Sequence, residues 1–132
     1  MLAPWIVTGA LTMLAGLLFE TVADQQKQAG KARNSDSFVS NGLYRRIRHP
    51  NYVGEMVFQI GLMLACIATA QTGLEYAACL IGPLYIVILM YYAGLGADEQ
   101  QQQRYGTDPA YAQYRQRSGT FRPGKGQLSQ PT

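Results

Sequence analysis

Long apolar stretches constrain this chain more than any other feature of its sequence. Three such blocks cover about residues 2–19, 52–70 and 74–95, and nearly all charged residues lie between or after them. A soluble domain would instead mix apolar and polar residues at the period of a helix or a strand. Because about 20 apolar residues cross the hydrocarbon core of a bilayer, the sequence predicts an all-α integral membrane helical bundle. It would have three transmembrane helices and short cytoplasmic helices.

A cleaved signal peptide is the alternative interpretation of the first block. Such a peptide carries basic residues before its apolar stretch and small residues at its cleavage site. Residues 1–5 contain no Lys or Arg, and Phe19-Glu20-Thr21 lacks the small residues that cleavage needs. Both observations favour a membrane helix.

The basic residues indicate the orientation of the chain. All 11 Lys and Arg residues lie either between the first and second blocks or after the third. Since basic residues are enriched in cytoplasmic loops, we expect segments 20–51 and 96–123 in the cytoplasm. The N-terminus would then lie outside and the C-terminus inside. The net charge of +3 reflects this topology and does not indicate a nucleic-acid partner.

Local signals subdivide the polar segments. Residues 20–31 are expected to extend the first helix as far as Gly30, and residues 34–41 to form a polar loop. Asp98 is a side chain of the type that caps helices. We therefore expect it to begin a separate glutamine-rich helix that runs through Arg104.

The remaining signals define a turn, a fourth helix and the domain limits. The Asp108-Pro109 pair predicts a short helix over residues 109–117. The segment 71–73 is too short to be more than a tight turn, so the second and third blocks should form an antiparallel hairpin. We expect a single membrane domain over residues 1–123 and a disordered tail over 124–132.

Small residues are spaced along the second block. Gly54, Gly61 and Ala65 would let the second helix approach another helix closely, although they do not identify the partner. Cys66 and Cys79 lie in apolar surroundings without Cys-x-x-Cys spacing, so we expect small buried side chains. A chain with one histidine has no multi-histidine metal site, and no metal site is predicted.

The most polar stretch beside a membrane block is residues 42–55. It contains three arginines and a histidine directly after Tyr44, at Arg45, Arg46, Arg48 and His49. Pro50-Asn51 should begin the second helix, whose free amides and neighbouring arginines would suit a phosphate or carboxylate. Glu55 lies one turn further on, and a carboxylate at that depth is a functional candidate because it is costly unless paired. The alternatives are arginine contacts with anionic lipid headgroups and a snorkelling Glu55.

Aromatic and basic residues gather again after the third block, at Arg104, Tyr105, Tyr111, Tyr114 and Arg117. Tyrosines and arginines at helical spacing can cover a flat ring and a phosphate. The alternative is an amphipathic helix that lies on the membrane surface with its tyrosines at the interface. Both clusters lie on the same side of the membrane, which favours a shared site.

Residues 42–45 and 48–55 read Gly-Leu-Tyr-Arg and Arg-His-Pro-Asn-Tyr-Val-Gly-Glu. They resemble the signature of the steroid 5-alpha-reductase-like membrane enzymes, and more closely that of a bacterial branch of this family. Three further segments are similar to that branch, at residues 19–27, 82–84 and 104–123. The resemblance suggests a bacterial inner membrane as the location.

The resemblance implies a cofactor pocket that opens to the cytoplasm, NADPH as the cofactor, and a lipid or sterol-like substrate with a C=C bond. Asn51 and Glu55 would contact the nicotinamide, while Asp24 and Lys31 would hold the nucleotide. The full set of implied cofactor-binding residues is Asp24, Lys31, Arg48, His49, Asn51, Tyr52, Glu55, Arg104, Tyr105, Tyr114 and Arg117.

The same superfamily leaves other functions open. Isoprenylcysteine carboxyl methyltransferases and phospholipid methyltransferases share an Arg-His-Pro-x-Tyr-x-Gly core and use S-adenosylmethionine; Asn51 with Glu55 favours the reductases. Reductases of this family carry their proton-donating Glu and Tyr on additional N-terminal helices, so we assign no catalytic residue. A second subunit or a homo-oligomer would supply the missing helices. An inactive remnant and a non-enzymatic membrane interaction protein are the remaining alternatives.

Overall fold

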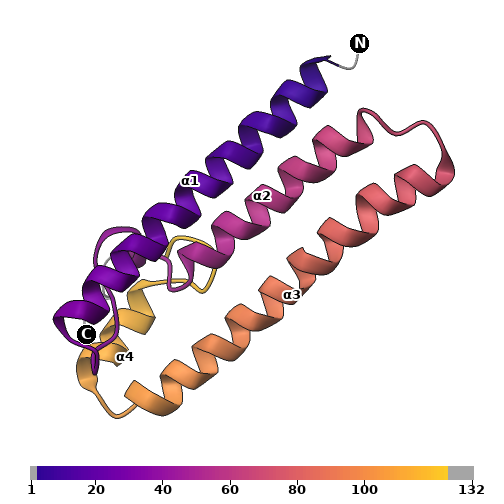
Figure 1. The fold of residues 1–132 in the computed structure, drawn as a ribbon. Helices are drawn as coiled ribbons and strands as arrows, with labels where there is room; N and C mark the ends of the chain where they lie inside the picture. Colours follow the sequence, from indigo (N-terminus) through magenta and orange to yellow (C-terminus); the bar gives the residue numbers. More distant parts are fainter. Residues whose placement is uncertain (1–2, 125–132) are drawn as a thin grey trace. The chain divides into compact units, whose positions relative to one another are not determined.

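The computed structural model describes residues 3–124 and is all-helical, as predicted (Figure 1). No strand occurs among these residues. The elements are α1 (Ala3–Arg33), the 3-10 helix η1 (Gly42–Arg45), α2 (Pro50–Ile67), α3 (Gly73–Tyr105) and α4 (Pro109–Arg117). Beyond Gly124, the predicted disordered tail lies outside the described residues.

The chain divides into two compact units. Among the described residues, the apolar unit holds 3–20 and 51–92, and the polar unit holds 21–50 and 93–124. Three helices, α1, α2 and α3, are long and apolar enough to cross a membrane. Only 17% of the most apolar window of each helix is buried inside the protein. Most of the apolar surface is therefore available to lipid, as in an integral membrane protein.

The helix ends follow from local sequence. Pro50 begins α2, where its fixed φ suits the first turn and its missing N–H removes no hydrogen bond. Asp108 caps α4 as predicted, because its Oδ1 accepts a hydrogen bond of 2.9 Å from the Ala110 N–H. Thr72 and Glu75 form a reciprocal capping box at the start of α3, with N–O distances of 3.1 and 3.2 Å.

The prediction that Asp98 begins a separate helix is wrong. Helix α3 runs without interruption from Gly73 to Tyr105 and includes Pro83. Asp98 lies within α3 and is 5% exposed, and its carboxylate accepts hydrogen bonds from side chains distant in the sequence. A buried aspartate with such partners does not need to cap a helix.

Glycines bring the backbones of α1 and α2 into contact, side by side in the apolar unit (Figure 1). A Cβ atom added to Gly16 would lie 2.6 Å from the Gly54 carbonyl oxygen, and one added to Gly9 would lie 2.7 Å from that of Gly61. Real Cβ atoms do not approach so closely. The partner of the small-residue face of α2 is therefore α1.

A disulfide bond joins Cys66 near the end of α2 to Cys79 in α3, with a Cα–Cα distance of 5.6 Å. The cysteines were expected to be small buried side chains, and Cys79 is buried, but the bond between them was not predicted. The turn between α2 and α3 is short, so the antiparallel hairpin brings together two residues that are 13 positions apart. The covalent link fixes the end of the hairpin that carries the turn.

Candidate functional site

A buried ion pair lies at the centre of the polar unit. Arg48 is 7% exposed and binds Asp98 through two parallel contacts of 3.0 Å, from Nε to Oδ1 and from Nη2 to Oδ2. His49 Nε2 lies 2.6 Å from the same Oδ1. Thr120 Oγ1 donates to Oδ2 at 2.6 Å. Four side chains from three separate stretches of sequence therefore meet at one carboxylate.

This carboxylate is ionised at neutral pH. Asp98 lies three residues beyond the apolar block 74–95. Burial acts to raise its pKa, but hydrogen bonds from His49, Arg48 and Thr120 outweigh burial and hold the pKa of the Asp98 carboxyl well below its usual range. An ionised carboxylate only accepts hydrogen bonds, so the Nε2 atom of His49 carries the proton in their contact.

The remaining donors of Arg48 hold the segment that follows α4. Its Nη1 donates to the Arg115 carbonyl oxygen at 3.0 Å and to the Ser118 carbonyl oxygen at 2.7 Å, and Nη2 also contacts Thr120 Oγ1 at 3.0 Å. All five guanidinium N–H groups thus have acceptors within the polar unit. This geometry gives Arg48 a positioning role, and its predicted contact with a cofactor stays a prediction, as does that of His49.

Backbone hydrogen bonds join the same two segments. The Arg48 N–H donates to the Gly119 carbonyl at 2.8 Å, and the Gly119 N–H donates to the Arg46 carbonyl at 2.9 Å. Ile47 and Gly119 form an isolated parallel bridge. Residues 46–48, from the polar stretch before α2, are thus bonded to Gly119, which follows α4.

The core of the polar unit is a cluster of three tyrosines, Tyr105, Tyr111 and Tyr114, which we call the tyrosine cluster. All three side chains are buried. Phe38, from the loop after α1, packs against all of them. Its ring stacks on Tyr114 with centroids 5.2 Å apart and meets the other two rings edge-on at 5.1–5.5 Å. The Phe38 ring is therefore part of the aromatic core of the polar unit.

Three cations surround the tyrosine cluster. Lys31 Nζ lies 5.5 Å from the centroid of the Tyr105 ring and Arg104 Cζ lies 5.1 Å from it. Arg117 Cζ lies 5.7 Å from the centroid of the Tyr114 ring. These distances are within the range of cation–π contacts. The structure thus places Lys31, which lies far away in the sequence, beside the cluster predicted at Arg104, Tyr105, Tyr114 and Arg117.

The two tyrosines on α4 are held in their neutral form. Burial raises the pKa of the Tyr114 hydroxyl above its usual range, and it raises that of Tyr111 as well. The Tyr114 hydroxyl donates to the Tyr44 carbonyl oxygen at 2.7 Å. Tyr111 and Tyr114 therefore add no negative charge to the cluster.

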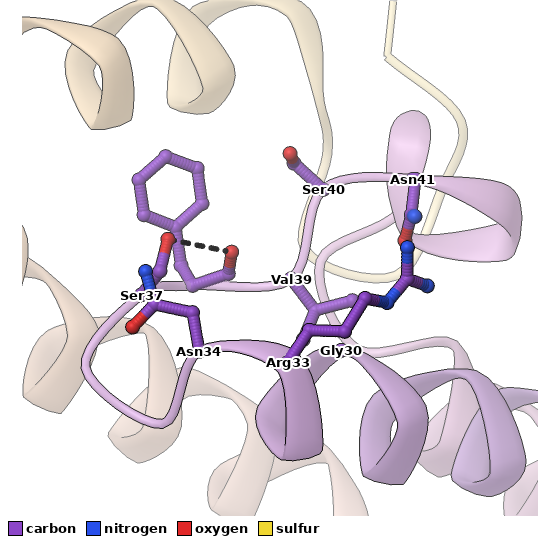
Figure 2. A pocket seen from close by; sticks show the side chains of 8 residues that line it. Gly30, Arg33, Asn34, Ser37, Val39, Ser40 and Asn41 are labelled. Atoms are coloured by element: carbon purple, nitrogen blue, oxygen red, sulfur yellow. Dashed lines mark hydrogen bonds between the residues drawn. The ribbon is translucent and has the colours of Figure 1, made fainter.

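A small pocket lies beside this cluster, between the end of α1 and the loop that follows (Figure 2). Its volume is about 200 Å³. It is lined by Gly30, Arg33, Asn34, Ser37, Phe38, Val39, Ser40 and Asn41. Sequence reasoning missed this pocket, because Ser and Asn side chains after a helix are typical of any polar loop.

The other predicted site residues lie elsewhere along the chain. Asn51, Tyr52 and Glu55 are half-buried residues of α2 in the apolar unit. Glu55 has a partner one turn further along the helix, because Gln59 Nε2 donates to its Oε1 at 2.9 Å. Asp24 is a half-buried residue of α1 in the polar unit.

A comparison with known protein families shows to which family the chain belongs. A family model described as "Protein of unknown function (DUF1295)" matches residues 1–118. The chain belongs to this family. The family is the steroid 5-alpha-reductase-like group, which confirms the resemblance at the level of the family. Comparisons with curated proteins and with solved structures gave no match.

Proposed function

We propose that the protein is the cofactor-binding part of a membrane-embedded, NADPH-dependent reductase that acts on a C=C bond of a lipid or sterol-like molecule. One observation carries the proposal, namely the buried tyrosine cluster with Lys31, Arg104 and Arg117 around it. Membership of the steroid 5-alpha-reductase-like group supports the reaction class.

The chemistry of the cluster suits a dinucleotide. Guanidinium or ammonium groups neutralise phosphates that would otherwise repel each other. The three tyrosine rings are buried and Phe38 stacks on Tyr114, so the rings form a fixed support for the cations that lie against them. Because Tyr111 and Tyr114 are neutral, they add no negative charge that would oppose a phosphate.

The chain's own residues would bind and orient the cofactor. In the polar unit, Arg104 and Arg117 would hold its phosphates, and Lys31, which donates to the Ser37 carbonyl and the Tyr105 hydroxyl, would add positive charge beside them. Asn51 and Glu55 stay predicted contacts of its nicotinamide end. When bound, NADPH supplies a hydride to a conjugated C=C bond, and the protein supplies orientation and electrostatics. The proton that completes the reduction would come from an acid outside the residues assigned here, on helices supplied by another subunit.

The location proposed is the bacterial inner membrane, with the N-terminus outside and the C-terminus in the cytoplasm. The disulfide supports this orientation. Cys66 lies near the end of α2, whereas Arg45, Arg46 and Arg48 directly precede the start of the same helix. Disulfides persist on the oxidising side of a membrane, and basic residues collect on the cytoplasmic side. The two signals therefore point to opposite ends of α2, as one orientation requires.

A methyltransferase is the second candidate, because the Arg48-His49-Pro50-x-Tyr52-x-Gly54 run fits that branch of the superfamily equally well. Its cofactor, S-adenosylmethionine, carries a flat ring but no phosphate. Loss of the cations around the tyrosine cluster would therefore affect it much less than it would affect NADPH.

The test is calorimetric binding of NADPH and of S-adenosylmethionine to the full chain in detergent. We expect NADPH to bind and each of Arg104→Gln and Arg117→Gln to weaken it about tenfold, because hydrogen bonds to charged groups contribute about 1.5–3 kcal/mol. Asn51→Ala should weaken it too. Arg122→Gln, which removes an exposed arginine that is not among the cations around the cluster, is the matched control.

Absence of NADPH binding to the wild type would overturn the proposal. So would NADPH binding that neither arginine variant weakens. Binding of S-adenosylmethionine alone would assign the chain to the methyltransferases.

A further inference from the structure

The pocket between the end of α1 and the loop after it has a polar lining that the proposed contacts around the tyrosine cluster do not use. Five of its lining side chains are polar, at Arg33, Asn34, Ser37, Ser40 and Asn41. In Figure 2 the Arg33 side chain extends toward Asn41. The lining of the pocket therefore includes one guanidinium together with amides and hydroxyls.

The charge of Arg33 is not used inside the protein. The side chain is exposed, and it has no ion pair or hydrogen bond with residues 3–124. Lys31, two residues earlier in α1, is already engaged by the Ser37 carbonyl at 2.6 Å and the Tyr105 hydroxyl at 3.0 Å. Between residues 27 and 48 the sequence carries six basic residues and one acidic residue. Arg33 is thus a cation in a basic segment and is available for an anion.

The walls of the pocket are held in place without a ligand. Lys31 holds the Ser37 carbonyl, Asn34 Oδ1 accepts from the Asp36 N–H at 3.1 Å, and Arg104 Nη2 donates to the Ser35 carbonyl at 3.2 Å. Gly30 forms part of the floor, where an added Cβ would lie 2.8 Å from a methyl group of Val39. Such a preformed pocket does not require the loop to order when a ligand binds.

The size and chemistry of the pocket select the ligand. About 200 Å³ is smaller than a site for a whole cofactor, so the pocket would take only one part of it. Guanidinium groups match phosphates with two parallel hydrogen bonds, and amides and hydroxyls pair with the hydroxyls of a sugar. An arginine beside the ribose is also how dinucleotide sites accept a 2′-phosphate. Phe38 lines this pocket and packs against the tyrosine cluster, so the two sites adjoin.

We propose that this pocket binds a phosphate monoester on a sugar, with Arg33 as its anion ligand, and that it selects NADPH over NADH. The inference rests on the proposed function for the identity of the nucleotide. A phospholipid headgroup that ends in a phosphate monoester offers the same chemistry, and the experiment distinguishes the two sources.

The experiment measures dissociation constants of NADPH, NADH and adenosine 2′-monophosphate for the full chain in detergent. The variants are Arg33→Gln, Arg33→Lys and, as a matched control, Arg45→Gln, which removes an exposed arginine outside the pocket. Arg33→Lys keeps the positive charge in the last turn of α1, where it interacts favourably with the helix dipole. It loses the bidentate hydrogen bonds that a guanidinium group makes to a phosphate. Circular dichroism checks that each variant remains folded.

We expect Arg33→Gln to weaken NADPH and adenosine 2′-monophosphate about tenfold to a hundredfold and to leave NADH unchanged. Arg33→Lys should have an intermediate effect and Arg45→Gln none. Equal losses for NADPH and NADH, or no loss for either, would overturn the inference while the proposed function stands.

A wild type that binds neither dinucleotide refutes the proposed function, whereas Arg33-dependent binding of adenosine 2′-monophosphate would still support the pocket. The last part of the experiment measures binding of the protein to vesicles that contain phosphatidic acid. If the protein binds these vesicles in an Arg33-dependent manner but does not bind adenosine 2′-monophosphate in that way, the nucleotide assignment is overturned in favour of a headgroup site.

Discussion

Replacing Asp98 with asparagine should destabilise the polar unit more than any other single change of one side-chain atom. The carboxylate accepts from Arg48, His49 and Thr120, and the side chains of Asp98 and Arg48 are each 8% exposed. Removing one partner of a buried ion pair leaves the other charge without compensation and costs about 3–5 kcal/mol. The asparagine amide also brings a donor to a place where every neighbour donates.

The assay is reversible unfolding in mixed micelles of a mild detergent and sodium dodecyl sulfate, followed by circular dichroism. Glu99→Gln is the control, since it removes the neighbouring carboxylate at an exposed position and should change stability by less than about 0.5 kcal/mol. Amide hydrogen exchange adds a local measurement. In Asp98→Asn the exchange of the Gly119 N–H, which bonds to the Arg46 carbonyl, should accelerate most.

A double-mutant cycle completes the test. The two single variants, Asp98→Leu and Arg48→Leu, each remove one partner of the buried ion pair. The double variant, Asp98→Leu with Arg48→Leu, removes both charges of the pair. The double variant should be more stable than the sum of the single losses predicts, because apolar replacement of a whole buried pair is often nearly neutral. A loss below about 1 kcal/mol in Asp98→Asn, or strict additivity in the cycle, would refute the reasoning.

Three further predictions follow from the described contacts. Gly16→Leu should destabilise the bundle by about 1–3 kcal/mol or more, because its Cβ would lie 2.5 Å from the Phe58 backbone nitrogen; Gly82→Leu, where nothing lies within 4 Å, should be nearly neutral in the same unfolding assay. The depressed pKa of Asp98 means that its stabilisation is complete above the ordinary pKa of 3.8 and is lost as the pH falls below that value. Unfolding midpoints measured from pH 7 to pH 3 should show this loss in the wild type, and a wild type that matches Asp98→Asn in acid sensitivity would contradict it. Replacing both Cys66 and Cys79 by serine should lower stability by about 2–3 kcal/mol for a closed loop of 13 residues. In the unfolded wild type, free thiols should appear only after reduction, and thiols detected without a reductant would rule out the bond.

The sequence predicted those parts of the fold that depend on local composition. The three spans follow from uninterrupted apolar length, and the start of α4 follows from the Asp108-Pro109 pair. The error at Asp98 has a clear cause, since its residue type suits a helix cap and its actual partner Arg48 lies 50 residues away. The disulfide was missed for a related reason, because each cysteine by itself is typical of a buried apolar residue.

The candidate site was predicted in part. Helical spacing drew attention to Tyr105 and Tyr114 with their arginines, and these residues do meet, with Lys31 beside them. The role of Phe38 had no local signal, because a single phenylalanine in a polar loop does not reveal what it packs against. The pocket was missed because its lining residues are ordinary loop residues until the chain folds around them.

The contact between α1 and α2 also limits how a substrate can travel. Their backbones touch at two levels, at Gly9 with Gly61 and at Gly16 with Gly54, seven residues apart on each helix. A hydrocarbon tail has no room to pass where even a methyl group would collide with main-chain atoms. A lipid-like molecule that moves sideways out of the bilayer therefore has to enter by another route, and the seam between these two helices acts as a closed wall.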